Sequence, residues 1–154
     1  ENVFETILAP MTGTAVAITE VPDPIFIEKI LGDGIAIVPT EGKVVSPVDG
    51  TVSKVAETGH IYAVTSDNGV EVVIHVGLET VALNGKCFQI HVKEGDKVKA
   101  GDLLADVDLE FIKETGRNSI TPIVIGSSLE GKELVCEEGE VQAGKTVIME
   151  IKQK

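Results

Sequence analysis

Hydrophobic and polar residues alternate along most of the chain in short runs that are rich in Val and Ile. The runs are separated by Gly, Pro, Asp and Asn, the residues that favour tight turns. This pattern predicts many short β-strands in an all-β fold, either a sandwich or a barrel-like structure. Helix is predicted only as short turns, over residues 24–30, 109–115 and 127–131. In the first of these, Asp23-Pro24 supplies a cap and a first-turn proline.

The most informative segment is a hairpin signal, Ser66-Asp67-Asn68-Gly69, which lies between His60 and His75. If Asn68-Gly69 forms a two-residue turn, His60 lies one diagonal step from His75. If Asp67-Asn68 forms the turn, the two histidines face each other directly. Because side chains alternate with a period of two, either register puts both rings on one face, with Cβ atoms roughly 5 to 8 Å apart. A loop of odd length would separate them.

The two faces of the second predicted strand differ in polarity. One face is wholly apolar and is predicted to face the core: Val70, Val72, Ile74 and Val76. The other face is mixed and is predicted to be open: Glu71, Val73 and His75. A lone histidine in a strand usually has a structural role. Two imidazoles that meet on an open face instead favour a chemical one.

The composition fits one globular domain over residues 1–154. Of the 154 residues 43% are apolar, enough to bury a core, and 16 Gly indicate many tight turns. Trp is absent, so the core must consist of Val, Ile, Leu and Ala. Cys87 and Cys136 lack a metal-type or redox-type spacing, so we expect both to pack in the interior, and a disulfide between them stays open.

The charge and hydropathy of the chain limit its partners. A net charge of -12 at pH 7 argues against nucleic acid, because binding a phosphate backbone relies on clusters of Lys and Arg. A basic protein partner fits this charge, and so does solubility alone. No apolar run is long enough to cross a bilayer, and the first residues lack a signal-peptide pattern. We therefore expect a cytoplasmic protein without direct membrane insertion.

Seven motifs, taken together and in order, are similar to those of one known family. They are Gly32–Pro39, Ser46–Thr51, Thr58–His60, Gly69–Val81, Gly85–Phe88, Gly95–Leu103 and Thr121–Val124. They resemble the glucose-specific IIA component of the bacterial phosphoenolpyruvate-dependent sugar phosphotransferase system. The similarity extends over residues 10–151, and motifs this many in a fixed order are specific. The resemblance implies an antiparallel β-sandwich.

The resemblance also implies a phosphoryl carrier. In that family a histidine phosphocarrier protein donates a phosphoryl group to one histidine, and the IIA protein passes it to a cysteine on the IIB domain of a glucose-type permease. By position, His75 bears the group, His60 steadies it and the Thr58 hydroxyl assists. If the Gly77 carbonyl binds Nδ1-H of His75, Nε2 is left bare. A neutral imidazole suits the task, since its unperturbed pKa of about 6.5 leaves a lone pair free. No cofactor is implied.

The family surrounds its histidines with apolar residues on which partner proteins dock. The matching positions are Ile25, Phe26, Ile30, Leu31, Val73 and Val81. Each could equally be a core residue, whereas an exposed apolar patch would mark an interface. Asp23 and Glu79 are assigned to the same docking surface, and Glu79 stands where the family commonly has Asp. Since some family members regulate other enzymes, regulatory protein targets are a further hypothesis.

Two other classes of function fit parts of the sequence. In a zinc-dependent hydrolase of lysostaphin-like architecture, His60, His75 and Glu79 would bind the metal. Such enzymes also need a His-x-His arm, and none of the three histidines here are two residues apart. The paired rings could still hold adventitious zinc. A biotinyl or lipoyl carrier is suggested by residues 94–102, but Lys86 lacks the local motif of such carriers.

Overall fold

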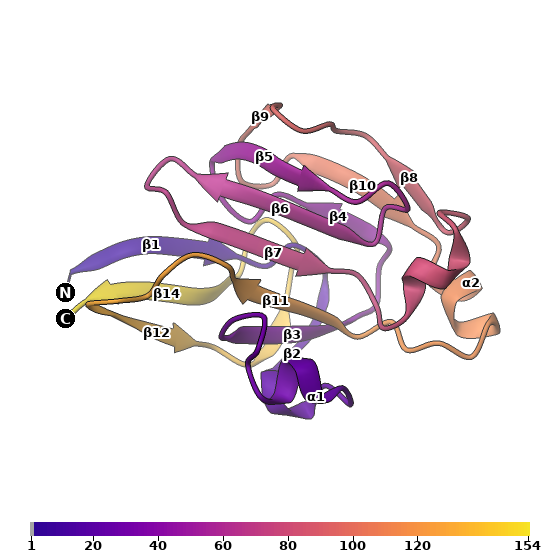
Figure 1. The fold of residues 1–154 in the computed structure, drawn as a ribbon, viewed down its shortest axis with the longest axis horizontal. Coiled ribbons are helices and arrows are strands. Elements are labelled where there is room, and N and C mark those ends of the chain that lie inside the picture. The colour runs from indigo at the N-terminus through magenta and orange to yellow at the C-terminus, as the bar shows by residue number, and fades with distance from the viewer. Residues whose placement is uncertain (1) are drawn as a thin grey trace.

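The computed structural model describes residues 2–154, so residue 1 of the predicted domain lies outside the described residues. Within this range the chain forms fourteen strands and two short α-helices (Figure 1). The strands are β1 Val3–Leu8, β2 Gly13–Ala17, β3 Gly34–Pro39, β4 Lys43–Val45, β5 Gly50–Val55, β6 Ile61–Ser66, β7 Glu71–His75, β8 Phe88–Ile90, β9 Lys97–Val98, β10 Leu103–Val107, β11 Thr121–Ile125, β12 Lys132–Cys136, β13 Gly139–Val141 and β14 Val147–Gln153. The helices are α1 Pro24–Ile27 and α2 Leu109–Glu114, with the 3-10 helices η1 Ile18–Glu20 and η2 Thr80–Leu83.

Antiparallel sheets build the molecule, which confirms the predicted all-β sandwich. The large sheet has the strand order β13-β2-β3-β11-β7-β6-β5-β9. Two smaller sheets have the orders β1-β14-β12 and β4-β10-β8. Figure 1 shows β5, β6 and β7 side by side, with β4 and β10 passing behind them. The tip of β7 points away from the end of the molecule where the N and C labels lie.

The helices are as short as predicted, and two of the three predictions are confirmed. Asp23 caps α1 by accepting a hydrogen bond from the Ile25 amide at 3.1 Å, and Asp108 caps α2 in the same way. The first helix ends early because Lys29 has a left-handed backbone, with φ 58°. The predicted helix over residues 127–131 is wrong. That segment is a turn, in which the Glu130 amide donates to the Ser128 hydroxyl.

The β6–β7 hairpin closes with a three-residue loop, so both predicted two-residue turns are wrong. Ser66 and Val70 face each other, and the Gly69 amide donates to the Ser66 carbonyl at 2.8 Å. Gly69 has φ 86°, the left-handed residue that completes this type of loop. The register is therefore shifted by one residue, and Ile61 faces His75. Strict alternation would now turn His60 to the opposite face.

His60 escapes this alternation because it lies just before the strand. β6 begins at Ile61, and Gly59, with φ 78°, forms a turn in which its amide donates to the Ala56 carbonyl. The His60 carbonyl in turn accepts a hydrogen bond from the Val76 amide at 2.8 Å. The two histidine segments thus meet where the ends of β6 and β7 leave the sheet, and the turn sets the direction of the His60 side chain.

Two hydrophobic clusters hold the fold. The larger lies between the sheets and includes the predicted core face of β7, Val70, Val72, Ile74 and Val76, each at most 4% exposed. The smaller lies on the outer face of β3 and β11 under η1 and α1: Ile18, Val21, Phe26, Ala36, Leu78, Ile120 and Val124. We call it the outer cluster. It supports the segment that follows His75, because Leu78 belongs to it.

The two cysteines are free thiols. Cys87 is buried, as expected, but the same expectation is wrong for Cys136, which is exposed at the end of the short strand β12. Among residues 2–154, no helix combines the length and apolarity that crossing a membrane requires.

The three-residue hairpin loop generates a stability prediction. Gly69→Ala should lower the free energy of unfolding by about 1 kcal/mol, because a Cβ disfavours the left-handed conformation. No atom lies within 4 Å of the added Cβ, so the cost is conformational and not steric. Gly69→Asn should cost less, since Asn tolerates this conformation. Urea unfolding measures both variants. Equal stability of wild type and Gly69→Ala, or a larger loss in Gly69→Asn, would contradict the loop geometry.

Candidate functional site

His75 ends β7, and its ring is fixed by the backbone that follows. Its Nδ1 lies 3.0 Å from the Gly77 carbonyl oxygen. A carbonyl oxygen can only accept a hydrogen bond, so Nδ1 carries the proton and the neutral ring has its lone pair on Nε2. The structure thus confirms the predicted contact between His75 and the Gly77 carbonyl. The ring has one bare nitrogen, which is the atom required of a nucleophile.

Gly77 can place its carbonyl there because it has no side chain. Its φ is 74°, and an added Cβ would lie 2.6 Å from Cγ2 of Thr80 and 3.1 Å from the carbonyl oxygen of Asn118. Thr80 is buried, and its hydroxyl donates to the Val76 carbonyl. The backbone therefore reverses tightly after His75, and only glycine fits the bend.

His60 stands beside His75 at nearly a right angle. The ring centroids are 5.6 Å apart, with an interplanar angle of 81°, which confirms the predicted proximity. Nδ1 of His60 lies 2.7 Å from Oγ1 of Thr58. A hydroxyl can donate or accept, so this contact orients the ring and permits either tautomer. When the Thr58 hydroxyl donates, Nε2 of His60 carries a proton that it can donate to a neighbouring anion.

Phe26 supports His75 from the outer cluster. The two ring centroids are 5.3 Å apart, with an interplanar angle of 70°. Phe26 was expected among the docking residues, but it is only 2% exposed. Its burial makes it a packing partner of the imidazole, and direct docking on Phe26 would require it to move.

Most of the other predicted apolar positions are exposed, and all but Ile30 line a hollow that reaches a histidine. Ile25, Ile30, Leu31 and Val81 are exposed large hydrophobic residues, and Val73 is half-buried. Ile25 and Val81 line a hollow of about 200 Å³ together with both histidines, Asp23 and Glu79. Leu31 and Val73 line a second hollow of about 350 Å³ that also reaches His75. An apolar surface thus surrounds the imidazole, although its docking role stays a prediction.

The surroundings lower the pKa of both histidines. For His75 the main cause is burial, which disfavours the imidazolium; the hydrogen bond to Gly77 and the charge of Asp23 act in the opposite direction. Burial also lowers the pKa of His60, followed by the charges of His75 and Lys54. Both rings are therefore neutral at pH 7, and the bare nitrogen of His75 is available for attack.

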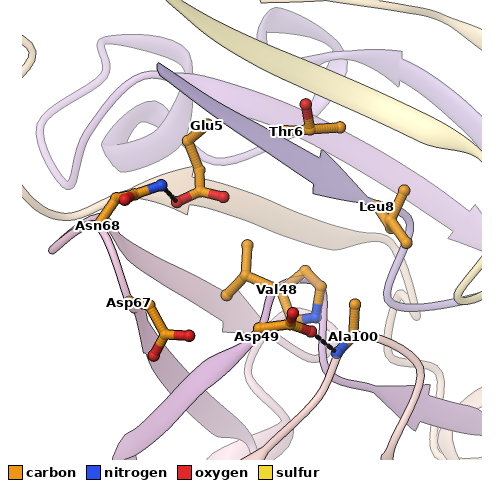
Figure 2. A pocket seen from close by; sticks show the side chains of 9 residues that line it. Glu5, Thr6, Leu8, Val48, Asp49, Asp67, Asn68 and Ala100 are labelled. Carbon is orange, nitrogen blue, oxygen red and sulfur yellow. Dashed lines mark hydrogen bonds between the residues drawn. The ribbon is translucent and has the colours of Figure 1, made fainter. Parts of the chain in front are cut away.

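A different pocket lies at the other end of the same hairpin, and its chemistry does not suit an anionic group. Figure 2 shows Glu5, Asp49 and Asp67 around it. The Asn68 side chain donates a hydrogen bond to Glu5, and the Ala100 amide donates one to Asp49. Three carboxylates would repel a phosphoryl group. The histidine hollow also contains two carboxylates, Asp23 and Glu79, but it has two imidazoles beside them, which the acidic pocket lacks.

The zinc hydrolase alternative finds no support in the structure. Within residues 2–154 no group of three or more His, Cys, Asp or Glu side chains is placed to hold a metal ion. The third histidine, His91, instead forms a hydrogen bond through Nε2 with Asp106, at 2.8 Å. A pair of rings lacks the third protein ligand that a catalytic zinc site needs.

Sequence reasoning missed the residues that support the loop after His75. Thr80 lies under Gly77, and the Asn118 carbonyl accepts a hydrogen bond from the Leu78 amide. Lys54, whose charge lowers the pKa of His60, was missed as well. Thr80 follows a recognisable glycine turn, so its position could have been suspected. Asn118 lies some forty residues away in the chain, and no local pattern connects it with His75.

Comparisons with known proteins agree with this arrangement. Residues 5–130 match the family model of the phosphoenolpyruvate-dependent sugar phosphotransferase system, EIIA 1. The glucose-specific EIIA component of Bacillus cereus is 47% identical over 151 residues, which cover 97% of this chain and 92% of that protein. An N-acetylglucosamine-specific EIICBA component of Klebsiella pneumoniae is 44% identical over 97% of this chain but only 23% of its own length.

A solved structure shows the same fold. The glucose permease IIA of Mycoplasma capricolum superposes with a TM-score of 0.88 at 36% identity, over 94% of each chain. The fold and these matches define a class, that of proteins which receive a phosphoryl group and pass it on. The chain belongs to the glucose-specific IIA family of the phosphotransferase system. It is thus a phosphotransferase component that acts as a phosphoryl carrier.

The causes of the pKa shifts can be tested separately. NMR titration should give both imidazoles pKa values below 6.5. Each ring therefore stays neutral until the pH falls below the pKa of a free histidine. Asp23→Asn should lower the pKa of His75 further, because the aspartate charge raises it. Asn still caps α1, so the helix is retained. Asp67→Asn removes the same charge at the far end of the hairpin and should leave the pKa of His75 unchanged.

Two results would contradict this account of the electrostatics. One is a pKa of His75 above 6.5 in the wild type. The other is an equal effect of Asp23→Asn and Asp67→Asn, which would show that net charge matters and the position of Asp23 does not.

Proposed function

We propose that His75 carries the phosphoryl group on Nε2. The donor is the histidine phosphocarrier protein, and the acceptor is a cysteine on the IIB domain of a glucose-type sugar permease. The observation that carries the proposal is the 3.0 Å contact between Nδ1 of His75 and the Gly77 carbonyl, because it leaves Nε2 as the free nucleophile. The fused EIICBA relative, in which such a IIA segment is one part of a longer chain, supports a IIB partner.

In the transfer, the lone pair of Nε2 forms a bond to phosphorus while the nitrogen–phosphorus bond of the donor breaks. The leaving imidazole takes the electron pair of that bond. His75 keeps the proton on Nδ1, so its ring gains positive charge and its hydrogen bond to the Gly77 carbonyl strengthens. The second transfer runs in the same manner, with a cysteine thiolate attacking phosphorus and His75 leaving as a neutral ring.

His60 acts on the transferring group and not as a second acceptor. During transfer, negative charge spreads over the equatorial phosphoryl oxygens, and catalysis consists mostly of positioning and of nearby donors. His60 lies within 5.6 Å of His75, centroid to centroid, and the Thr58 hydroxyl holds it by Nδ1. Its Nε2-H can therefore donate to a phosphoryl oxygen. Thr58 assists by fixing that orientation.

One surface serves both partners in turn. The exposed apolar residues around the histidines supply docking area, with Asp23 and Glu79 in the same hollow. Carboxylates at this position suit a basic partner, as does the net charge of -12. The central imidazole must stay accessible to two different proteins, so a shallow hollow is more useful here than a deep pocket. Regulatory protein targets that use the same surface stay a hypothesis.

The setting of the relay follows from the same proposal. We place the exchange in the cytoplasm, where free thiols such as Cys87 and Cys136 persist in their reduced form. Residues 1–154 are proposed to act as one IIA domain without direct membrane insertion and without a cofactor. Which sugar crosses the membrane is decided by the permease and not by these residues.

The three histidines of the chain allow a matched mutational test. The protein is incubated with phosphoenolpyruvate and the two general proteins of the phosphotransferase system, one of which is the histidine phosphocarrier protein. Under these conditions His75→Gln should acquire no phosphoryl group. His60→Phe, which keeps a ring but has no hydrogen-bond donor, should still accept the group but pass it to a IIB domain at least tenfold more slowly, since one positioned donor typically contributes ~10²-fold or more. His91→Gln, which changes a ring bonded to Asp106, should behave as wild type.

Quantified phosphoryl transfer by mass spectrometry checks each variant. Labelling that persists in His75→Gln would overturn the assignment of the acceptor. Onward transfer from His60→Phe at the wild-type rate would remove the role given to His60.

A further inference from the structure

The loop that carries the Gly77 carbonyl is held from the segment that follows α2. Arg117 is the single arginine of the chain, and its Nε donates to the Glu79 carbonyl at 3.1 Å. The carbonyl of the next residue, Asn118, accepts the Leu78 amide at 2.9 Å. Residues 117 and 118 therefore bind two successive residues after Gly77. One of these bonds comes from a side chain and can be removed by mutation.

This loop needs external support because its backbone is unusual. Gly77 has φ 74° and Glu79 has φ 60°, so two of three consecutive residues are left-handed. A residue with a Cβ keeps this conformation only where neighbouring contacts hold it. The 3-10 helix η2 starts directly after Glu79 and carries Val81 to the rim of the hollow. The conformation of Glu79 thus orients the chain on both sides of it: the preceding residues, which include Gly77, and the following helix η2, which carries Val81.

We infer that Arg117 is a positioning residue for phosphoryl transfer. Through the Glu79 carbonyl it holds the Gly77–Glu79 loop, and through the Gly77 carbonyl the loop holds the tautomer of His75. The inference rests on the proposed function of His75. Arg117 contacts the loop by Nε, so what matters is a hydrogen-bond donor at that position and not the positive charge.

Two substitutions separate the donor from the charge. The amide nitrogen of glutamine lies as many bonds from Cα as Nε of arginine, so Arg117→Gln keeps a donor and loses the charge. Arg117→Met has similar length but no donor. Lys113→Gln is the control, because it removes one positive charge from the same polar hollow beside α2, which Lys113 and Arg117 both line.

The first readout is the imidazole of His75 by nitrogen NMR, and the second is the rate of phosphoryl acceptance. In Arg117→Met, a share of His75 should move its proton to Nε2, and the pKa of His75 should fall further because the Gly77 bond that raises it is weakened. Acceptance should slow by about fivefold, as expected for one lost hydrogen bond. Arg117→Gln and Lys113→Gln should match the wild type in both readouts, and thermal melting should show that all three variants are folded.

Two outcomes overturn the inference: wild-type behaviour of Arg117→Met, or equal defects in Arg117→Gln and Arg117→Met. If Arg117→Met does not fold, a measurement on the wild-type protein tests the inference instead. Its Nε-H should exchange slowly with solvent and show a coupling across the hydrogen bond to the Glu79 carbonyl, and fast exchange without that coupling overturns the inference. Absence of phosphate on His75 in the wild type would refute the proposed function instead, while the tautomer comparison would still test the role of Arg117.

Discussion

A single hydrogen bond, from Nδ1 of His75 to the Gly77 carbonyl, determines what the site can do. An imidazole in water exchanges its proton between two nitrogens, but a carbonyl oxygen on one side removes that freedom, because it accepts and never donates. The proton is held on Nδ1, and the lone pair is held on Nε2. Burial lowers the pKa of the ring, so the lone pair is not lost to protonation near neutral pH. The proposed nucleophile, Nε2 of His75, is thus left free by a backbone contact that needs no partner.

The rest of the structure keeps that bond in place. The main core holds β7 by its apolar face, and the outer cluster packs Phe26 against the His75 ring and Leu78 under the loop. Gly77 allows the chain to bend back, and residues 117 and 118 hold the bend from outside. The result is an imidazole that is held at Nδ1, packed against Phe26 and surrounded by apolar residues in a shallow hollow. Such a setting suits the proposed relay, in which two proteins reach the ring in succession.

Much of this could be predicted from the sequence, and the errors have physical causes. The apolar face of β7, the cap of α1, the paired histidines and the Gly77 contact follow from local patterns and from family resemblance. The hairpin register could not be obtained, because Ser66-Asp67-Asn68-Gly69 is compatible with loops of two or three residues. The proximity of the rings survived this error only because Gly59 turns the chain just before His60.

The support from Arg117 was not visible in the sequence, since its hydrogen bond to Glu79 spans 38 residues and involves a backbone oxygen. Phe26 illustrates a different limit, because an apolar residue on a short helix can face a partner or the interior, and here it faces the imidazole.

The most direct test of the central claim is to identify the nitrogen that bears phosphorus. The protein, labelled with nitrogen-15 in its histidines, is phosphorylated through the phosphoenolpyruvate relay, and the nitrogen–phosphorus coupling is measured by NMR. The coupling should involve Nε2 of His75, with the proton retained on Nδ1. Phosphorus on Nδ1 of His75, or on either nitrogen of His60, would contradict the account, because the Gly77 carbonyl would then not select the nucleophile.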